Sequence, residues 1–529
     1  PATIMLLTIS FVQAAALLRF ASQPYRLGFI PPAETARLHR PVRATAEQAA
    51  LAAAWSSWPR AWVPLASTFE LDPERPTPVR FLGRTFVVWQ DNDADWRAFE
   101  DACPHRLAPL SEGRIDRHAN ALECAYHGWQ FTPTGSCARI PQAEPKVQKT
   151  ACASSKACVK AYPLHVEKSV VFVWPWSGVP PDPNAKEGDA SPTQSLAEMA
   201  LPRHQLASVV PGASTYTRDL PYGWDTLLEN IVDPSHIPFA HHGLQGKRED
   251  AIPINMSDTI TVKETGFDFK FEDRTGGRFR SGSGEFRAPY VISYAAEYLP
   301  KPGAPAPPPG TPPRTFNLTL AMIPISAGWS RAIIFGAKND YNAPKPSAGQ
   351  EGKGSLDGVG SQPAKGKKKK ASIFAIIFGL MPIWLTHMLS SRFLDSDLAF
   401  LHYQEQEIQR RGTLDYFMPA PADRPIGALR KWLAEYIPSL GPLPPPIWER
   451  SRLLDRWAQH SSHCVHCQRG LEGVNRWRQR VSATLALSLI GFKWMPFRFV
   501  AATCLALLGA LQAIGDQFKW QDFKHYQNH

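Results

Sequence analysis

The sequence predicts an α+β protein in which an antiparallel β domain is followed by a mixed α+β domain and a pair of apolar helices. Short alternating runs separated by turn residues fill residues 55–177 and predict an antiparallel sheet. The following region mixes helical segments with runs that predict strands, which is typical of an α+β fold. The clearest of these runs are Ile260–Lys263, Phe267–Phe271, Phe316–Met322 and Ala332–Phe335.

Length and charge narrow the class of protein. The 529 residues exceed one ordinary domain, so two globular domains with additional segments are expected. Four of the charges behind the net value of +11 lie in one run, Lys367–Lys370, and no zinc-finger or RNA-binding signature accompanies them. We therefore expect no nucleic acid partner, and a solvated basic surface or attraction to anionic lipid instead. Eight cysteines in so long a chain are typical of a reducing compartment.

The N-terminal segment has the composition of a targeting peptide. Residues 1–50 hold two acidic residues against five arginines and are rich in alanine. This pattern predicts an organellar transit peptide, which we place at residues 1–54. A membrane or core helix is the alternative interpretation.

The first metal motif is C-x-H followed by C-x-x-H. Cys103 and His105 are separated by eighteen residues from Cys124 and His127. Two thiolates and two imidazoles hold the two irons of a high-potential [2Fe–2S] cluster. Zinc also accepts Cys₂His₂ sets, but zinc fingers pair Cys with Cys and His with His, whereas each loop here supplies one of each. We expect a [2Fe–2S] cluster, shielded from water by Trp129.

The second motif contains two histidines, His236 and His241. Asn230, Asp233 and His236 recur every three residues, so on a helix they would share one face and place a carboxylate beside a ligand histidine. Pro238 disfavours an unbroken helix between the histidines. Two histidines and one carboxylate form a mononuclear Fe(II) site with open positions for O₂ and substrate.

The carboxylate of this second site must come from elsewhere in the chain. Asp395 and Asp397 are the candidates, and the sequence leaves both open. Asp233 and Asn230 are the candidate catalytic residues beside the iron ligands.

A CxxC pair, Cys464 and Cys467, follows the second domain. This spacing suits a reversible disulfide that exchanges with thioredoxin. The adjacent His463 and His466 also allow a metal half-site, and an inert thiol pair is the third interpretation.

Two apolar stretches, Val481–Phe492 and Phe499–Gly515, lie near the C-terminus. Neither reaches the roughly 20 apolar residues of a full membrane span. Basic residues flank both outer ends, which predicts a hairpin whose two ends lie on one side of the membrane. Two packed core helices are the alternative.

With these motifs in place, the chain resembles the Rieske oxygenases, and within them the chloroplast group that includes pheophorbide a oxygenase. Five stretches carry the resemblance: CPHRLAPLSEGR from Cys103, YHGW from Tyr126, RDLPYGWDTLLENIVDPSHIPFAHH from Arg218, LDSDLAFLHYQE from Leu394 and DRWAQHSSHCVHC from Asp455. The CxxC with its hydrophobic tail separates this group from the bacterial ring-hydroxylating oxygenases.

The resemblance implies a helix-grip α+β catalytic domain and head-to-tail homotrimers. In such a trimer the cluster of one subunit reduces the iron of its neighbour through a bridging aspartate, which maps onto Asp233. The iron-ligand histidines map onto His236 and His241, and the later aspartate maps best onto Asp397, with Asp395 still open.

The resemblance also implies a function. An enzyme of this group uses O₂ and reduced ferredoxin to open the macrocycle of pheophorbide a during chlorophyll breakdown, at a chloroplast membrane of the envelope or thylakoid. Two alternatives stay open: an oxygenase of another tetrapyrrole, such as chlorophyllide or protochlorophyllide, and a redox-sensing Rieske component of the import machinery.

The expected organisation divides the chain into five parts. They are a leader (1–54), a Rieske domain (55–177), a catalytic domain (178–440) with low-complexity insertions (301–314 and 344–370), a CxxC segment (441–475) and a membrane-anchoring hairpin with its tail (476–529).

Overall fold

The computed structural model describes most of the chain after the expected leader. The described residues are 45–177, 206, 209, 214–275, 280–300, 313–335, 381–490 and 493–523. The expected insertion 344–370 lies outside them, as does 301–314 except for its last two residues. The first described helix, α3 (Ala46–Ser57), runs across the expected boundary between leader and Rieske domain.

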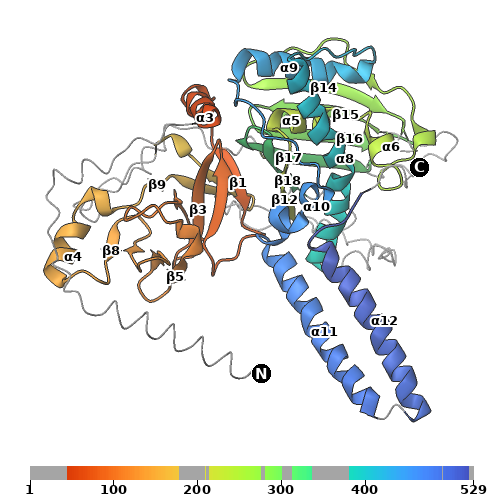
Figure 1. Cartoon of the computed structure of the whole chain (residues 1–529). Helices are drawn as coiled ribbons and strands as arrows, with labels where there is room; N and C mark the ends of the chain where they lie inside the picture. Colours follow the sequence, from red (N-terminus) through yellow and green to blue (C-terminus); the bar gives the residue numbers. More distant parts are fainter. Residues whose placement is uncertain are drawn as a thin grey trace, which may run out of the picture. The chain divides into compact units, whose positions relative to one another are not determined.

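The first domain is built from small antiparallel sheets (Figure 1). Their strands run in the orders β1-β11-β10, β2-β3-β4-β9 and β5-β6-β7-β8. The bounds are β1 (Val63–Ser67), β2 (Thr77–Phe81), β3 (Arg84–Gln90), β4 (Trp96–Glu100), β5 (Arg114–Asp116), β6 (Ala121–Glu123), β7 (Gln130–Phe131), β8 (Cys137–Arg139), β9 (Ala161–Tyr162), β10 (Leu164–Glu167) and β11 (Val170–Val173). Helix α4 (Pro145–Cys152) is tied to β8 by a disulfide between Cys137 and Cys152.

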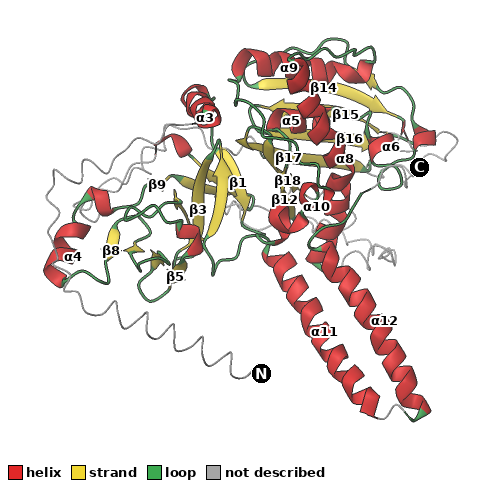
Figure 2. Cartoon of the chain, viewed as in Figure 1, coloured by secondary structure: helices red, strands yellow, loops and turns green. Residues whose placement is uncertain are grey.

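The second domain is one antiparallel sheet of seven strands with helices packed against it (Figure 2). The strand order is β12-β18-β17-β16-β15-β14-β13. The bounds are β12 (Thr215–Leu220), β13 (Asn255–Met256), β14 (Gly266–Asp273), β15 (Arg280–Arg287), β16 (Val291–Tyr298), β17 (Thr315–Ser326) and β18 (Trp329–Phe335). The helices are α5 (Trp224–Val232), α8 (Ile383–Arg411) and α9 (Arg424–Tyr436), and this arrangement confirms the predicted α+β class.

Three of the four expected strand runs lie in β14, β17 and β18, but the fourth is wrong. Of Ile260–Lys263, only Lys263 pairs, in a single bridge to Gly266, because the chain turns there into β14. Strand β15 was not predicted, because its sequence RSGSGEFR shows no apolar alternation. Its glycines are required by packing: a Cβ at Gly284 would lie 2.3 Å from the ring of Phe269.

The C-terminus forms two long helices that contact each other, α11 (Val465–Ile490) and α12 (Met495–Gln517) (Figure 1). Both exceed the apolar stretches expected from the sequence: α11 includes the polar and charged residues that precede its apolar half, and α12 extends beyond Phe499–Gly515 at both ends. Cys464 lies immediately before α11 and Cys467 in its first turn, so the CxxC pair is continuous with the hairpin. Among the described helices, α12 is the one long and apolar enough to cross a membrane.

Candidate functional site

Two loops of the first domain share one backbone geometry. The amide of Leu107 donates to the carbonyl of Cys103 at 2.8 Å, and the amide of Gly128 donates to the carbonyl of Cys124 at 2.9 Å. Leu107 and Gly128 both have positive φ, +59° and +70°. Each of the two segments, C-x-H and C-x-x-H, therefore forms one tight turn. In both turns the residue with positive φ follows the cysteine by four positions, so the two loops have the same backbone geometry.

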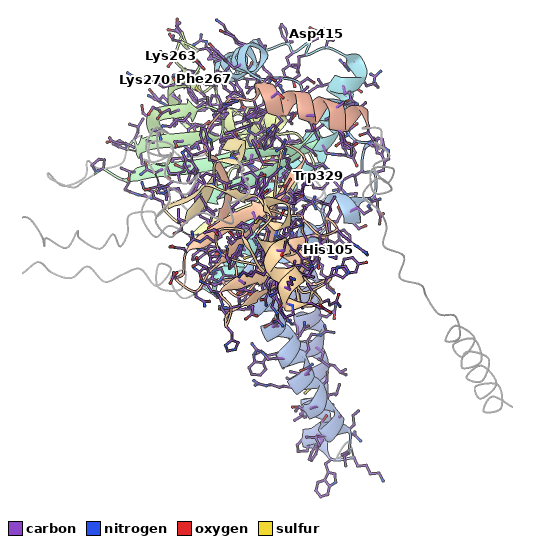
Figure 3. The ribbon with its side chains drawn as sticks, turned by 90° about the vertical axis from the view of Figure 1, so that its left-hand side faces the viewer. His105, Lys263, Phe267, Lys270, Trp329 and Asp415 are labelled. Atoms are coloured by element: carbon purple, nitrogen blue, oxygen red, sulfur yellow. A yellow bond between two sulfur atoms is a disulfide. The ribbon has the colours of Figure 1, made fainter. Side chains whose placement is uncertain are left out.

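The four side chains of these loops are arranged as two pairs. Cys103 and Cys124 are buried in the domain core, whereas the rings of His105 and His127 lie outside it, 4.5 Å apart between centroids. Trp129 stacks on His105 with ring centroids 4.9 Å apart. His105 lies at the surface (Figure 3), so the histidine-bound iron would face solvent or a docked partner.

The donor set fits a two-iron cluster. Burial, reinforced by the neighbouring Cys124, raises the pKa of the Cys103 thiol to about 12, so two thiolates here require cations beside them. Cysteines paired inside and histidines paired outside match a cluster in which one iron takes both sulfurs and the other takes both nitrogens.

The second site begins where α5 ends. We expected Asn230, Asp233 and His236 on one helical face, and this is wrong, because α5 stops at Val232 and Asp233 is extended with φ −94° and ψ 106°. The cause is Pro234, since the residue before a proline is sterically pushed out of the α region. The break therefore falls at Pro234 rather than at Pro238, which is accommodated in the first turn of helix α6 (Ile237–Ala240).

Helix α6 (Ile237–Ala240) is a single turn with His236 at one end and His241 at the other. Their Nε2 atoms approach to 3.3 Å. Asp397 on α8 completes the group: its Oδ2 lies 3.4 Å from Nε2 of His241 and 4.0 Å from Nε2 of His236. All three ligand atoms lie within 4.8 Å of one another, the geometry of a site for a single metal ion.

Asp395 points elsewhere, because two residues along a helix turn the side chain by about 200°. It forms buried ion pairs with Arg218, at 2.7 Å, and with Arg456. Of the two candidate carboxylates, Asp397 is the one beside the histidines.

The electrostatics of Asp397 fit a cation. Burial raises its pKa to about 7 despite the opposing charge of His236, and its Oδ1 has no hydrogen-bond partner within the described residues. A buried carboxylate with an unpaired oxygen is costly. A divalent ion between Asp397 and the two histidines removes that cost.

His241 is oriented by α8 as well. Its Nδ1 lies 2.7 Å from Ser396 Oγ, which donates to the carbonyl of Phe393 at 2.6 Å, and the Phe393 ring stacks on the imidazole. Ser396 therefore accepts the Nδ1 proton, and the Nε2 lone pair faces Asp397. Nothing in the sequence pointed to Ser396, which lies between the two aspartates.

Removing the Ser396 hydroxyl is expected to weaken iron binding by about 10- to 100-fold, because the partner that fixes the His241 ring is lost. Titrating iron-free Ser396→Ala protein with Fe(II) and following recovered activity measures this. The matched control is Ser391→Ala on the same helix, whose hydroxyl contacts Tyr216 rather than His241. Equal iron affinity in both variants would contradict an orienting role.

Asp233 lies beside the site without belonging to the metal group. Its Oδ1 accepts from the amide and hydroxyl of Ser235, and its Oδ2 lies 3.6 Å from Nδ1 of His236. Burial acts to raise the pKa of Asp233, but the contacts with His236 and Ser235 outweigh it and hold the pKa below its usual range. Asn230 is buried in α5, and within the described residues no hydrogen bond joins its amide to Asp233 or His236.

The CxxC cysteines have different neighbours from those expected. Cys464 and Cys467 are 1% and 2% exposed, and the imidazoles beside them belong to His387 and His460. Neither His463 nor His466, which adjoin the cysteines in the sequence, joins this cluster. His466, for example, contacts the carbonyl of Phe69.

Comparison with known proteins agrees with this geometry. A family model described as the Rieske [2Fe-2S] domain matches residues 61–163, and one described as pheophorbide a oxygenase matches 286–414. Pheophorbide a oxygenase of Arabidopsis thaliana is 32% identical over 440 residues, which cover 78% of this chain and 72% of that protein. The chain belongs to the pheophorbide a oxygenase family of Rieske oxygenases.

Two further relatives are nearly as similar to this chain. Flavonoid 8-hydroxylase 2 of Ocimum basilicum is 30% identical, covering 79% of this chain and 74% of that protein. The protochlorophyllide-dependent translocon component 52 of Arabidopsis thaliana is also 30% identical with the same coverage. As a Rieske oxygenase of this family, the chain carries a [2Fe–2S] cluster and a mononuclear iron, takes electrons from ferredoxin, reacts with O₂ and resides in the chloroplast.

Proposed function

We propose that this chain oxygenates a chlorophyll-derived tetrapyrrole and that its substrate is pheophorbide a, whose macrocycle it opens. The observation that carries the proposal is the convergence of His236, His241 and Asp397 in a chain similar to pheophorbide a oxygenase over most of its length. An electron carrier without a substrate has no need of this second metal group, which disfavours a purely redox-sensing role in protein import.

Each residue of the two centres has a defined task. Cys103, His105, Cys124 and His127 hold the cluster, and His236, His241 and Asp397 hold the mononuclear iron. That iron, when bound, supplies the activation of O₂ for attack on the ring. Ser396 keeps the His241 ring in its ligating tautomer. The buried position of Asp397 keeps bulk water away from the metal group.

We assign electron delivery to a contact between subunits of a homotrimer. The cluster loops expose Leu107 and Tyr126, which are 74% and 63% exposed beside the surface-facing His105. Large apolar side chains around a redox centre are typical of a docking surface. Asp233, partly exposed and held as a carboxylate next to His236, is the acceptor to which a cluster histidine of the neighbour would hydrogen-bond.

Asp233→Asn is expected to slow reduction of the mononuclear site while leaving both metals in place. The neutral asparagine amide is a weaker hydrogen-bond acceptor than the Asp233 carboxylate for the cluster histidine of the neighbouring subunit. Single-turnover kinetics with a prereduced cluster measure the rate directly. A single-turnover rate equal to the wild-type rate, at full iron content, would refute the bridging role.

Mixed oligomers test the subunit route itself. Cys103→Ser protein lacks a working cluster and His236→Ala protein lacks the mononuclear iron, so neither is expected to turn over alone. Co-expressed in one oligomer, they regain activity if electrons pass between subunits. Absence of activity from mixed oligomers that contain both intact centres would show transfer within one chain.

We further infer that α11 and α12 anchor the enzyme in a chloroplast membrane. The apolar half of α11, residues 481–490, is about 15 Å long, half of a bilayer core. Its end exposes Leu487, Leu489 and Ile490, and α12 returns beside it. The hairpin therefore enters and leaves on one side.

Replacing Leu487, Leu489 and Ile490 together by glutamate is expected to abolish binding to vesicles of galactolipid and phosphatidylglycerol, because three charges cannot enter the apolar core. These side chains are exposed, so the fold is retained. Flotation with the vesicles measures binding, and Leu414→Glu, an exposed leucine outside the hairpin, is the control. Undiminished flotation of the triple variant would refute the anchor.

The substrate is tested with iron-loaded enzyme, reduced ferredoxin and O₂. Pheophorbide a, chlorophyllide a, protochlorophyllide a and a flavone are offered separately, the flavone because of the similarity to flavonoid 8-hydroxylase 2. Loss of the chlorin bands with pheophorbide a alone is the expected result. Turnover of another compound instead would identify that compound as the substrate. Turnover of none of the four would favour the import-associated role.

A further inference from the structure

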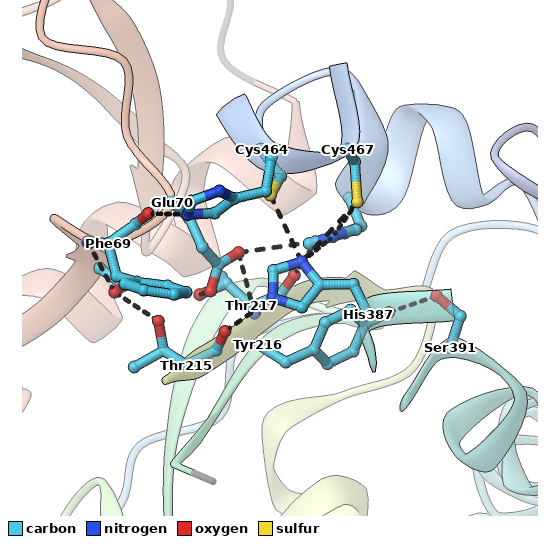
Figure 4. A network of polar contacts seen from close by, with 12 residues as sticks. Phe69, Glu70, Thr215, Tyr216, Thr217, His387, Ser391, Cys464 and Cys467 are labelled. Atoms are coloured by element: carbon cyan, nitrogen blue, oxygen red, sulfur yellow. Dashed lines mark hydrogen bonds and ion pairs between the residues drawn. The ribbon is translucent and has the colours of Figure 1, made fainter. Parts of the chain in front are cut away.

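Four buried donors outside both iron centres form a compact cluster. They are His387 on α8, His460 in the short π-helix η10 (Trp457–Ser461), Cys464 just before α11 and Cys467 in its first turn. Their ligand atoms all lie within 4.8 Å of one another, and none of the four residues is more than 3% exposed. Figure 4 shows the side chains of Cys464 and Cys467 pointing toward His387. Three separate elements of the chain thus deliver two nitrogens and two sulfurs to one point.

The distances are those of a single tetrahedral ion. His387 Nδ1 lies 3.2 Å from His460 Nε2, 3.4 Å from Cys464 Sγ and 3.7 Å from Cys467 Sγ. His460 Nε2 lies 3.3 Å from Cys467 Sγ. A regular tetrahedron with zinc bonds of about 2.0–2.1 Å to nitrogen and about 2.3 Å to sulfur has edges of roughly 3.3–3.8 Å. In the Rieske loops, by contrast, the sulfurs and the imidazoles form separate pairs.

The second nitrogen of each ring is already committed. His387 Nε2 lies 3.0 Å from the carbonyl of Thr215 on β12 (Figure 4). His460 Nδ1 lies 2.5 Å from the carbonyl of Thr217 on the same strand. Carbonyl oxygens only accept, so these nitrogens carry the protons. The lone pairs of His387 Nδ1 and His460 Nε2 therefore point at the sulfurs, as in metal sites whose histidines are fixed by outer hydrogen bonds.

We propose that His387, His460, Cys464 and Cys467 bind one Zn²⁺ in a closed structural site. Two thiolates balance the charge of the ion, two neutral imidazoles complete four-coordination, and no position is left for water or substrate. The burial that suits such a site is unfavourable for thioredoxin, because an attacking thiolate must reach one of the sulfurs.

The site joins the C-terminal hairpin to the catalytic domain. The zinc ion would link the ligands on η10 and at the start of α11 to His387 on α8. His387 precedes Asp397 on the same helix by ten residues, or about 15 Å. Around the cysteines, Met388, Val474 and Phe518 form a small apolar core of their own. A zinc ion here fixes the base of the hairpin against α8 independently of which substrate the enzyme takes.

Metal analysis of the full-length enzyme, purified without chelators, tests the site. We expect one zinc per chain in addition to the two irons of the cluster and the mononuclear iron. His387→Ala, Cys464→Ser and Cys467→Ser are expected to lose the zinc while keeping the visible spectrum of the Rieske cluster. The controls are His466→Ala, a histidine between the two cysteines, and Cys504→Ser, a buried cysteine of α12; both are expected to retain zinc.

Cobalt provides a readout that does not depend on folding of the variants. Exchange of the zinc for Co²⁺ in the wild-type enzyme, with the iron cluster in place, is expected to give the absorption bands of tetrahedral cobalt bound to sulfur. Wild-type enzyme with full iron content but less than about a tenth of a zinc per chain, and no such cobalt spectrum, would overturn the proposal. A Cys464–Cys467 disulfide that thioredoxin reduces in the native enzyme would also overturn it.

Discussion

His236→Ala protein is expected to show no detectable oxygenation while its cluster absorbs like that of the wild type. The variant removes one of three donors, and His241 with Asp397 cannot hold the iron alone. The proposed cluster ligands lie in the other domain and are untouched. Iron analysis should give two irons per chain in place of three, and reduction by ferredoxin should proceed normally.

His242→Ala is the matched control for this variant. His242 adjoins His241, but its Nδ1 accepts from the amide of Arg248 and takes no part in the metal group. Its turnover and iron content should stay close to the wild-type values. If the His236→Ala enzyme keeps three irons and its activity, His236 is not a ligand of the mononuclear iron.

The second large expected effect distinguishes the role of Asp395 in stability from the role of Asp397 in iron binding. Asp395→Asn is expected to lower the free energy of unfolding by about 3–5 kcal/mol, because Arg218 and Arg456 would keep their charges in the interior without a full counter-charge. The side chains of Arg218 and Arg456 are 0% and 2% exposed. Asp397→Asn is expected to cost far less stability and to lose the mononuclear iron. Denaturant unfolding and iron analysis of both variants measure the difference.

The two variants control each other, since they place the same substitution two residues apart on one helix. Asp395→Asn protein that remains folded should still bind three irons. The opposite pattern, in which Asp395→Asn loses iron and Asp397→Asn unfolds, would reverse the assignment of the two carboxylates.

The parts of the site set by short stretches of chain could be predicted from the sequence. The cluster ligands lie two and three residues apart in tight turns, and the structure places those turns side by side at the predicted residues. His236 and His241 are five residues apart, and one turn of helix brings them together. The fold class was also predictable, because β14, β17 and β18 carry clear apolar patterns.

The parts that depend on distant segments could not be predicted in this way. Asp397 lies more than 150 residues from His241, and only the rotation of α8 decides that it, rather than Asp395, faces the histidines. Local spacing likewise suggested His463 and His466 beside the CxxC pair, whereas His387, 77 residues before Cys464, occupies that place. Asp233 lies near His236 through a proline-induced break in the helix and not along a helical face.

The most direct test of the account is oxygenation under ¹⁸O₂. Iron-loaded enzyme, reduced ferredoxin and pheophorbide a are combined, and the products are analysed by mass spectrometry, with His236→Ala protein as the blank. We predict an opened tetrapyrrole that contains ¹⁸O with the wild-type enzyme and none with the blank. Oxidation of ferredoxin with pheophorbide a left intact, or an opened product without the label, would contradict the assignment of this chain as a pheophorbide a oxygenase.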